Sequence, residues 1–197
     1  MKKIIVLVLF SVSSFSQIKK ETKIINLEPS LRLGINSPIY FGNNFLAKDF
    51  SGGVGFSSNF TFIKVYQTNL SFGYEYNQFN LKNKDVIGNF EYMKKHCYFV
   101  EASQNITLNT KFSIVPFIQF AAANIKFKNE ERKTIAKQNG NEIKIGSYLD
   151  YNFNSTYTAY FGINFIKYFN RLNANDTDQK YFGNSNAIQL TLGFEFN

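Results

Sequence analysis

The C-terminal stretch from Asn184 to Asn197 constrains the fold more than any other part of the chain. Its side chains alternate strictly between apolar and polar, with apolar residues at Ile188, Leu190, Leu192, Phe194 and Phe196. Period-two alternation predicts a strand with one apolar and one polar face. Such a strand has an edge that must be protected from further pairing, and closure of the sheet into a barrel is the simplest protection.

Alternation of the same kind recurs along the chain. Seven further segments show it, around Leu31–Asn36, Gly53–Phe62, Leu70–Asn77, Tyr98–Leu108, Ile114–Phe127, Ile143–Phe153 and Tyr157–Phe165. Within Ile114–Phe127 the apolar positions change phase, which predicts a β-bulge near Ala121 to Ala123. The last segments match the roughly 9 to 11 residues with which a tilted strand crosses a membrane.

The connections between these segments alternate in length. Short ones are expected near residues 63–67, 109–111 and 154–155, and long polar ones near residues 37–51, 80–95, 128–141 and 170–183. Long loops at one end and tight turns at the other are typical of an outer-membrane barrel. We therefore predict an all-β, eight-stranded, antiparallel, up-and-down transmembrane β-barrel, with both termini on the same side of the membrane.

The N-terminus indicates how such a barrel is exported. Lys2 and Lys3 precede the apolar run Ile4–Phe10, and Ser14-Phe15-Ser16 supplies small residues before Gln17. This pattern predicts a cleaved signal peptide over residues 1–16, followed by a single barrel domain over residues 17–197. No later stretch approaches the roughly 20 apolar residues of a transmembrane helix, so none is expected.

Composition agrees with a β-protein. The chain has 23 Phe and 12 Tyr and lacks Trp, which is a strand-forming bias. The formal charge is +8, and a basic surface is either simply solvated or attracted to anionic lipid headgroups. An exported chain without a recognition motif is not expected to bind nucleic acid. The single cysteine, Cys97, excludes an internal disulfide.

The chain resembles the small eight-stranded outer-membrane β-barrels of the OmpA/OmpX type. Two features carry the resemblance: the terminal run from Leu190 to Phe196, and the strand-turn-strand unit from Tyr98-Phe99-Val100-Glu101 to Pro116-Phe117. It implies the outer membrane of a Gram-negative bacterium, with membrane lipid and lipopolysaccharide as partners. It also implies that Phe194 and Phe196 form the signal read by the barrel-insertion machinery, although Asn197 follows them here.

Glycine indicates which face of the strands points inward. Seven glycines lie on the polar faces: Gly34, Gly53, Gly55, Gly73, Gly146, Gly162 and Gly193. A narrow eight-stranded lumen needs small side chains, so the polar faces are expected inside and the apolar faces toward lipid. A soluble ligand-binding barrel would have the opposite arrangement.

The predicted lumen contains charged residues. They are Arg32, Glu75, Glu101, Lys144, Asp150 and Glu195. Charged side chains inside a narrow lumen must be paired, because each isolated buried charge costs several kcal/mol. Arg32 on the first strand and Glu195 on the last are expected to pair across the closure, and Glu75 and Glu101 are expected to be neighbours on adjacent strands. A structural polar network is the favoured interpretation.

Three functions are compatible with this plan. We favour a non-enzymatic integral outer-membrane protein with a structural, adhesive or envelope-protective role through its extracellular loops. The alternative is a narrow pore for ions or small solutes. A lipid A-modifying barrel enzyme is less favoured, because the only histidine, His96, has no serine two residues away, and the adjacent Cys97 should point to the opposite face.

Two further expectations concern ligands. A single His and a single Cys do not make a zinc site, so neither a metal nor a cofactor is expected. Lys94 and Lys95 adjoin a predicted strand end and are candidate contacts for the phosphates of lipopolysaccharide. The sequence does not specify an extracellular ligand of the loops.

Overall fold

The computed structural model describes residues 25–82, 90–129, 131, 133–170 and 176–197. The predicted signal peptide and its cleavage point lie outside these ranges. The elements, in chain order, are β1 (Ile25–Asn26), β2 (Ser30–Phe41), α2 (Phe45–Asp49), β3 (Phe50–Val65), β4 (Thr68–Leu81), β5 (Tyr92–Gln104), β6 (Ile106–Thr107), β7 (Phe112–Lys128), β8 (Thr134–Asn152), β9 (Tyr157–Asn170), α4 (Asp176–Gly183) and β10 (Asn184–Phe196). Of the helices in the described ranges, none has the length and apolar character that a membrane crossing requires.

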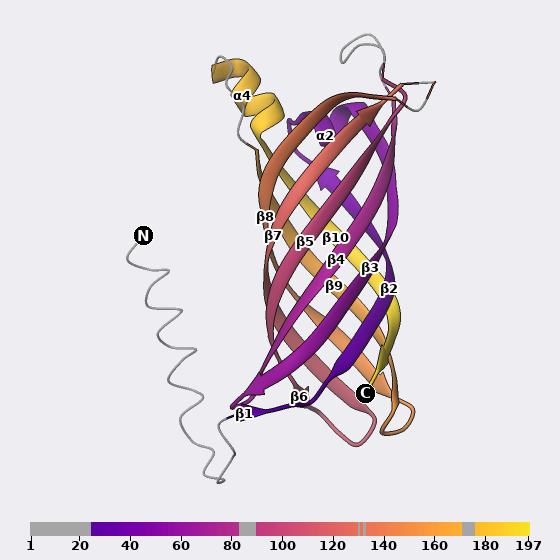
Figure 1. The fold of residues 1–197 in the computed structure, drawn as a ribbon, viewed down its shortest axis with the longest axis vertical. Helices are drawn as coiled ribbons and strands as arrows, with labels where there is room; N and C mark the ends of the chain where they lie inside the picture. The colour runs from indigo at the N-terminus through magenta and orange to yellow at the C-terminus, as the bar shows by residue number, and fades with distance from the viewer. Residues whose placement is uncertain (1–24, 83–89, 130, 132, 171–175) are drawn as a thin grey trace.

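Within the described residues, eight long strands form one closed antiparallel barrel (Figure 1). The ring runs β2-β3-β4-β5-β7-β8-β9-β10, and β10 pairs back to β2. The short strands β1 and β6 lie at the end that also holds the C-terminus, and α2 lies at the opposite end. The predicted all-β, eight-stranded, antiparallel barrel is confirmed.

The closing strand β10 is paired along its whole length. It pairs with β9 from Asn184 to Phe196 and with β2 from Asn186 to Phe196. In the second pairing Glu195 lies opposite Arg32. Closure therefore protects the edge of this strand, as its alternation predicts.

The two faces of the wall differ in polarity, as predicted. Apolar side chains point outward and remain exposed, reaching 64% at Ile35, 57% at Ile145 and 65% at Leu192. Inward positions are crowded. At Gly73, an added Cβ would meet the carbonyl oxygen of Ser58 and the ring of Phe99, which explains the need for glycine there.

The predicted bulge in the fifth long strand is wrong. Strand β7 alternates regularly from Phe112 to Lys128, without a shift in its pairing with β5 and with one shift against β8, between Phe127 and Lys128. Toward one end its outer face becomes polar, at Asn124 and Lys126, while the inner positions Ile125 and Phe127 are apolar and buried. This change of polarity imitates a change of phase in the sequence.

The predicted long loops are shorter than expected. Strand β4 reaches Leu81, β5 begins at Tyr92, and β8 begins at Thr134, so part of the stretch 128–141 belongs to the barrel wall. Both faces of this part of β8 carry polar residues such as Gln138 and Asn139. Alternation of polarity is therefore missing from a segment that is nevertheless a strand.

Candidate functional site

The lumen is the candidate site that the sequence predicts. Its lower end, which is the end that holds the C-terminus in Figure 1, contains an arginine between two carboxylates. Arg32 Nη2 donates to Asp150 Oδ2 at 2.7 Å, and Arg32 Nε donates to Glu195 Oε2 at 2.9 Å. The hydroxyl of Ser30 also donates to Glu195, at 2.7 Å. The guanidinium lies 4.5 Å from the centre of the Tyr148 ring. The structure thus brings Arg32 and Glu195 together across the closure and adds Asp150 to them.

Two carboxylates occupy the middle of the lumen, each with its own donors. Glu75 accepts from Lys144 Nζ at 2.6 Å. Glu101 accepts from Asn59 at 2.9 Å and from the hydroxyl of Tyr148 at 3.0 Å. The two carboxylates thus have separate donors, although Glu75 Oε1 has no hydrogen-bond partner within the described residues.

The prediction that Glu75 and Glu101 are neighbours is wrong. The register of β4 and β5 places Glu75 opposite Cys97 and Glu101 opposite Ser71. Adjacent strands alone do not make two residues neighbours, because the register decides which residues face each other.

The upper part of the polar lumen holds a fully buried ion pair. Lys95 Nζ donates to Glu142 Oε1 at 2.6 Å and to the hydroxyl of Tyr40 at 3.0 Å, and both charged side chains are fully buried. The thiol of Cys97 lies 3.6 Å from Glu142 Oε2. Glu142 also lies 3.9 Å from Lys144, so the charged groups continue down the lumen.

Lys95 therefore does not contact lipopolysaccharide, and that prediction is corrected. Alternation in β5 turns Lys94 outward and Lys95 inward. Sequence reasoning also missed Glu142, the partner of Lys95. The signal was present, because Glu142 continues the period-two series of Lys144 and Asp150 on the inner face of β8.

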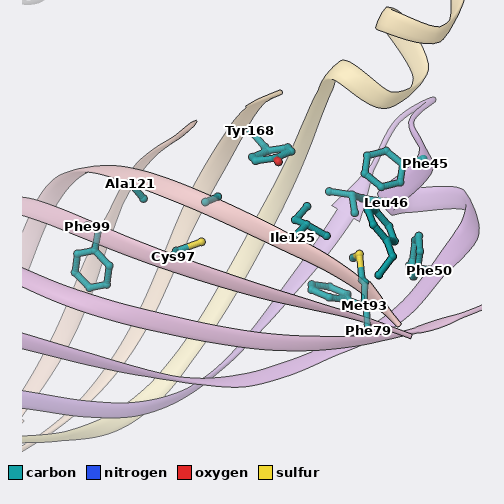
Figure 2. Close-up of a cluster of buried hydrophobic side chains, with 12 residues drawn as sticks. Phe45, Leu46, Phe50, Phe79, Met93, Cys97, Phe99, Ala121, Ile125 and Tyr168 are labelled. Atoms are coloured by element: carbon teal, nitrogen blue, oxygen red, sulfur yellow. The ribbon is translucent and has the colours of Figure 1, made fainter. Parts of the chain in front are cut away.

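Beyond Lys95 the lumen becomes apolar and is closed by α2. Phe45 and Leu46 of this helix are 0% and 2% exposed and point toward Phe50, Phe79 and Met93 (Figure 2). The rings of Phe45 and Phe50 meet edge to face, with centroids 6.1 Å apart. We call Phe45, Leu46, Phe50, Phe79 and Met93 the apolar cap.

Local sequence explains why the chain turns into the mouth here. Asn44 is the N-cap of α2, with an extended backbone, and its side chain accepts from the amide of Ala47 at 3.0 Å. Asparagine is among the preferred N-cap residues. The following pair, Phe45 and Leu46, then lies on the face of the helix that turns into the barrel.

Helix α4 holds the cap in place from outside. The hydroxyl of Tyr181 donates to Asp49 Oδ2 of α2 at 2.6 Å, and the ring of Phe182 lies 5.5 Å from that of Phe45. Partial desolvation and the neighbouring carboxylate of Asp49 raise the pKa of Tyr181 to about 12. Neither helix was expected from the sequence, which predicts only polar loops at these places.

The opposite end of the lumen is open. A polar cavity of about 360 Å³ is lined there by Arg32, Asp150 and Glu195, together with residues of the short connections. Arg32 Nη1 and Asp150 Oδ1 have no hydrogen-bond partner within the described protein, so both can be hydrated from this cavity. The lumen is thus a polar vestibule at one end and an apolar seal at the other.

His96 and Cys97 lie on opposite faces of the wall. His96 Nδ1 lies 2.7 Å from the hydroxyl of Tyr74 on the outside, whereas Cys97 is fully buried inside. The two side chains therefore do not form a nucleophile and base pair. The described side chains also include no group of three or more His, Cys, Asp or Glu that could hold a metal ion.

Comparison with known proteins identifies the fold. No family model and no curated relative matches the sequence. Among solved structures, Neisserial surface protein A matches with a TM-score of 0.58 and 9% identity, over 85% of this chain and 96% of that one. A major outer membrane protein of Thermus thermophilus matches with a TM-score of 0.51 and 8% identity, over 86% and 99%.

A third solved structure is Ail, the attachment invasion locus protein of Yersinia pestis, in complex with the heparin analogue sucrose octasulfate. It matches with a TM-score of 0.50 and 13% identity, over 85% of this chain and 97% of that one. At these identities the likeness concerns the fold. The chain has the fold of the small eight-stranded outer-membrane β-barrels.

Proposed function

We propose that this protein is a non-enzymatic integral outer-membrane barrel of a Gram-negative bacterium, exported by a signal peptide at residues 1–16. Its sealed lumen makes it a rigid anchor, with a structural, adhesive or envelope-protective role carried by the extracellular end. The observation that carries this proposal is the combination of an apolar outer wall with a charged lumen closed by the apolar cap. The apolar outer wall supports insertion into a membrane, and the closed lumen supports an anchor over a conducting pore.

The outer wall supports insertion into a membrane. On β7 the outward apolar side chains run from Phe112 to Phe120, a span of nine residues, and other strands show comparable exposed rows. This length matches the apolar band of a transmembrane barrel, which is about 25 Å tall. An exposed apolar surface that surrounds the whole barrel is far larger than the patches of a few hundred Å² found on soluble monomers.

The lumen supports an anchor over a pore. Ion pairs cross it at Lys144 and Glu75 and at Lys95 and Glu142, each at 2.6 Å, and the apolar cap closes the upper mouth. Separating either pair leaves uncompensated buried charges, which costs about 3–5 kcal/mol. An ion would have to displace both pairs and the cap.

Planar-bilayer conductance tests this proposal. Refolded protein whose insertion is verified by its heat-modifiable migration on a denaturing gel should produce no resolved channels. Channels that are altered by Lys144→Met would instead establish the pore alternative. A matched Lys133→Met variant changes a lysine that pairs with Glu131 on the exposed connection between β7 and β8, and it controls for the loss of one charge.

The lipid A-modifying alternative has its own test. Mass spectrometry of lipid A from cells with and without the protein should show the same acylation pattern. An altered pattern that depends on His96 would overturn the non-enzymatic assignment.

We also propose that Phe194 and Phe196, which point outward from β10, form the signal for the insertion machinery. Phe196→Ala should slow insertion by the reconstituted machinery but leave spontaneous folding into detergent unchanged. Phe165→Ala, an outward phenylalanine on neighbouring β9, is the control and should behave as the wild type. Equal insertion rates for the two variants would exclude this role.

A further inference from the structure

A row of lysines crosses the outer wall above the apolar band. Lys94 of β5 lies opposite Lys126 of β7, and Lys126 lies opposite Lys137 of β8. Alternation turns all three outward, while Lys95 and Ile125 point into the lumen. We call Lys94, Lys126 and Lys137 the lysine row.

The lysine row has no counter-charge within the described part of the chain. The ion pairs found there join other lysines, such as Lys64 with Glu28 and Lys133 with Glu131. Like charges directly opposite on neighbouring strands destabilise a sheet. Three such lysines side by side therefore favour an anion bound from outside.

The wall is hollowed directly below the lysine row. A groove of about 640 Å³ is lined by Tyr98, Ala122, Asn124, Asn139 and Asn141, and it extends to Lys137. A second hollow of about 480 Å³ shares Ala122 and Asn141 with the first and continues to Phe120 and Phe169. Small Ala122 forms the floor where the two meet.

The groove changes chemistry along its length. At its upper end the side-chain amide of Asn124 donates to that of Asn139, and amides of this kind suit sugar hydroxyls. At its lower end Phe120 and Phe169 offer an apolar surface. A ligand that fits is therefore anionic at the top, polar in the middle and apolar at the bottom.

Height in the membrane points to the same ligand. Asn124 and Lys126 lie four and six residues beyond Phe120 on β7, or about 13 and 20 Å along the strand at about 3.3 Å per residue. Strand tilt of about 40° reduces the vertical distance. The amides and the lysine row then lie just above the acyl chains, in the headgroup layer.

We propose that this outer wall of β5, β7 and β8 binds the phosphorylated sugar headgroup of an anionic outer-leaflet glycolipid. The lysine row takes the phosphates, the three asparagines take sugar hydroxyls, and the Ala122 floor seats the start of an acyl chain. This site rests on the proposed membrane function, because that function fixes the orientation in which the α2 end of the barrel lies in the outer leaflet. It retains Lys94 as a lipid contact and replaces the buried Lys95 by Lys126 and Lys137.

Native mass spectrometry of the refolded barrel in detergent tests the site. The probe is diphosphorylated lipid A, with dephosphorylated lipid A as the comparison. The wild type should bind the phosphorylated form, and Lys94→Gln/Lys126→Gln/Lys137→Gln should weaken that binding about a hundredfold, since each basic residue near an anionic headgroup contributes about a factor of five. Dephosphorylated lipid A should bind the wild type more weakly than the phosphorylated form does. Its binding to the triple variant should equal its binding to the wild type.

Matched variants distinguish binding at this site from the effect of a general loss of positive charge and from a folding defect. Lys48→Gln/Lys111→Gln/Lys180→Gln removes the same charge from exposed lysines elsewhere and should bind as the wild type. Ala122→Leu fills the groove without a charge change and should weaken binding, whereas Ala159→Leu on the outer face of β9 should not.

Each outcome decides between the proposals. Equal losses in the two triple variants, or equal binding of both lipid A forms by the wild type, would overturn the glycolipid site. A heat-modifiable barrel without lysine-dependent binding leaves the anchor proposal intact. Loss of the heat-modifiable barrel in the wild type itself would overturn the anchor proposal instead.

Discussion

Replacement of Glu142 by glutamine should destabilise the barrel more than a neutral substitution at an exposed outward position. Glu142 is 1% exposed and is the carboxylate partner of Lys95, which is fully buried and lies 2.6 Å from it. Glu142→Gln keeps the shape of the side chain but removes its charge. The ammonium of Lys95 then has only neutral acceptors, the amide oxygen of the new glutamine and the hydroxyl of Tyr40, which lies at 3.0 Å.

The expected magnitude follows from that lost partner. Removal of one member of a buried ion pair costs about 3–5 kcal/mol, because the remaining charge stays in a low-dielectric interior. Replacement of both members by apolar residues is often neutral. The double variant Lys95→Met/Glu142→Leu should therefore recover most of the stability that Glu142→Gln loses.

Urea unfolding in lipid vesicles, followed by far-ultraviolet circular dichroism, measures the effect. With a urea dependence of about 2 kcal/mol per molar, a loss of about 4 kcal/mol lowers the midpoint by about 2 M. Gln78→Ala, an exposed residue on the outer face of β4, should leave the midpoint nearly unchanged. A Glu142→Gln midpoint close to the wild type, or a double variant no more stable than the single one, would refute the argument.

Three further predictions concern the wall and the cap. Gly73→Val should lower stability by about 1–3 kcal/mol in the same urea assay, because its side chain would overlap the Phe99 ring. Phe45→Ala should speed the reaction of buried Cys97 with a thiol reagent at least about tenfold, since less of the apolar cap covers the lumen; an unchanged rate would contradict the seal. Because the pKa of Tyr181 is about 12 in the folded protein and about 10 in the unfolded chain, its contribution to stability should be lost as the pH rises between these values, and Tyr181→Phe should make the fall in stability over this range smaller.

Local alternation was enough to predict the barrel. Each outward row in β9 and β10 is visible in the sequence because outward-facing and lumen-facing positions differ in polarity. The Arg32 and Glu195 pair was also predictable, since closure places the first and last strands side by side. These inferences need only the period of a strand and the even number of strands.

Features that depend on register or on mixed polarity were not predictable. The lysine row exists because three strands align in one register, and no single segment reveals that alignment. Next to the apolar cap the inner face of β7 is apolar, so Ile125 and Phe127 imitate a bulge. Helix α2 is too short for a 3.6-residue pattern to appear in the sequence.

The most direct test of the account is the environment of the outer wall in a lipid bilayer. In a Cys97→Ser background, spin labels at Leu192 in the apolar band and at Asn139 above it report collisions with oxygen and with a water-soluble nickel chelate. We predict frequent oxygen collisions and few nickel collisions at Leu192, which is 65% exposed, and the reverse at Asn139. Frequent nickel collisions at Leu192 would mean that its face meets water, and they would contradict the membrane barrel.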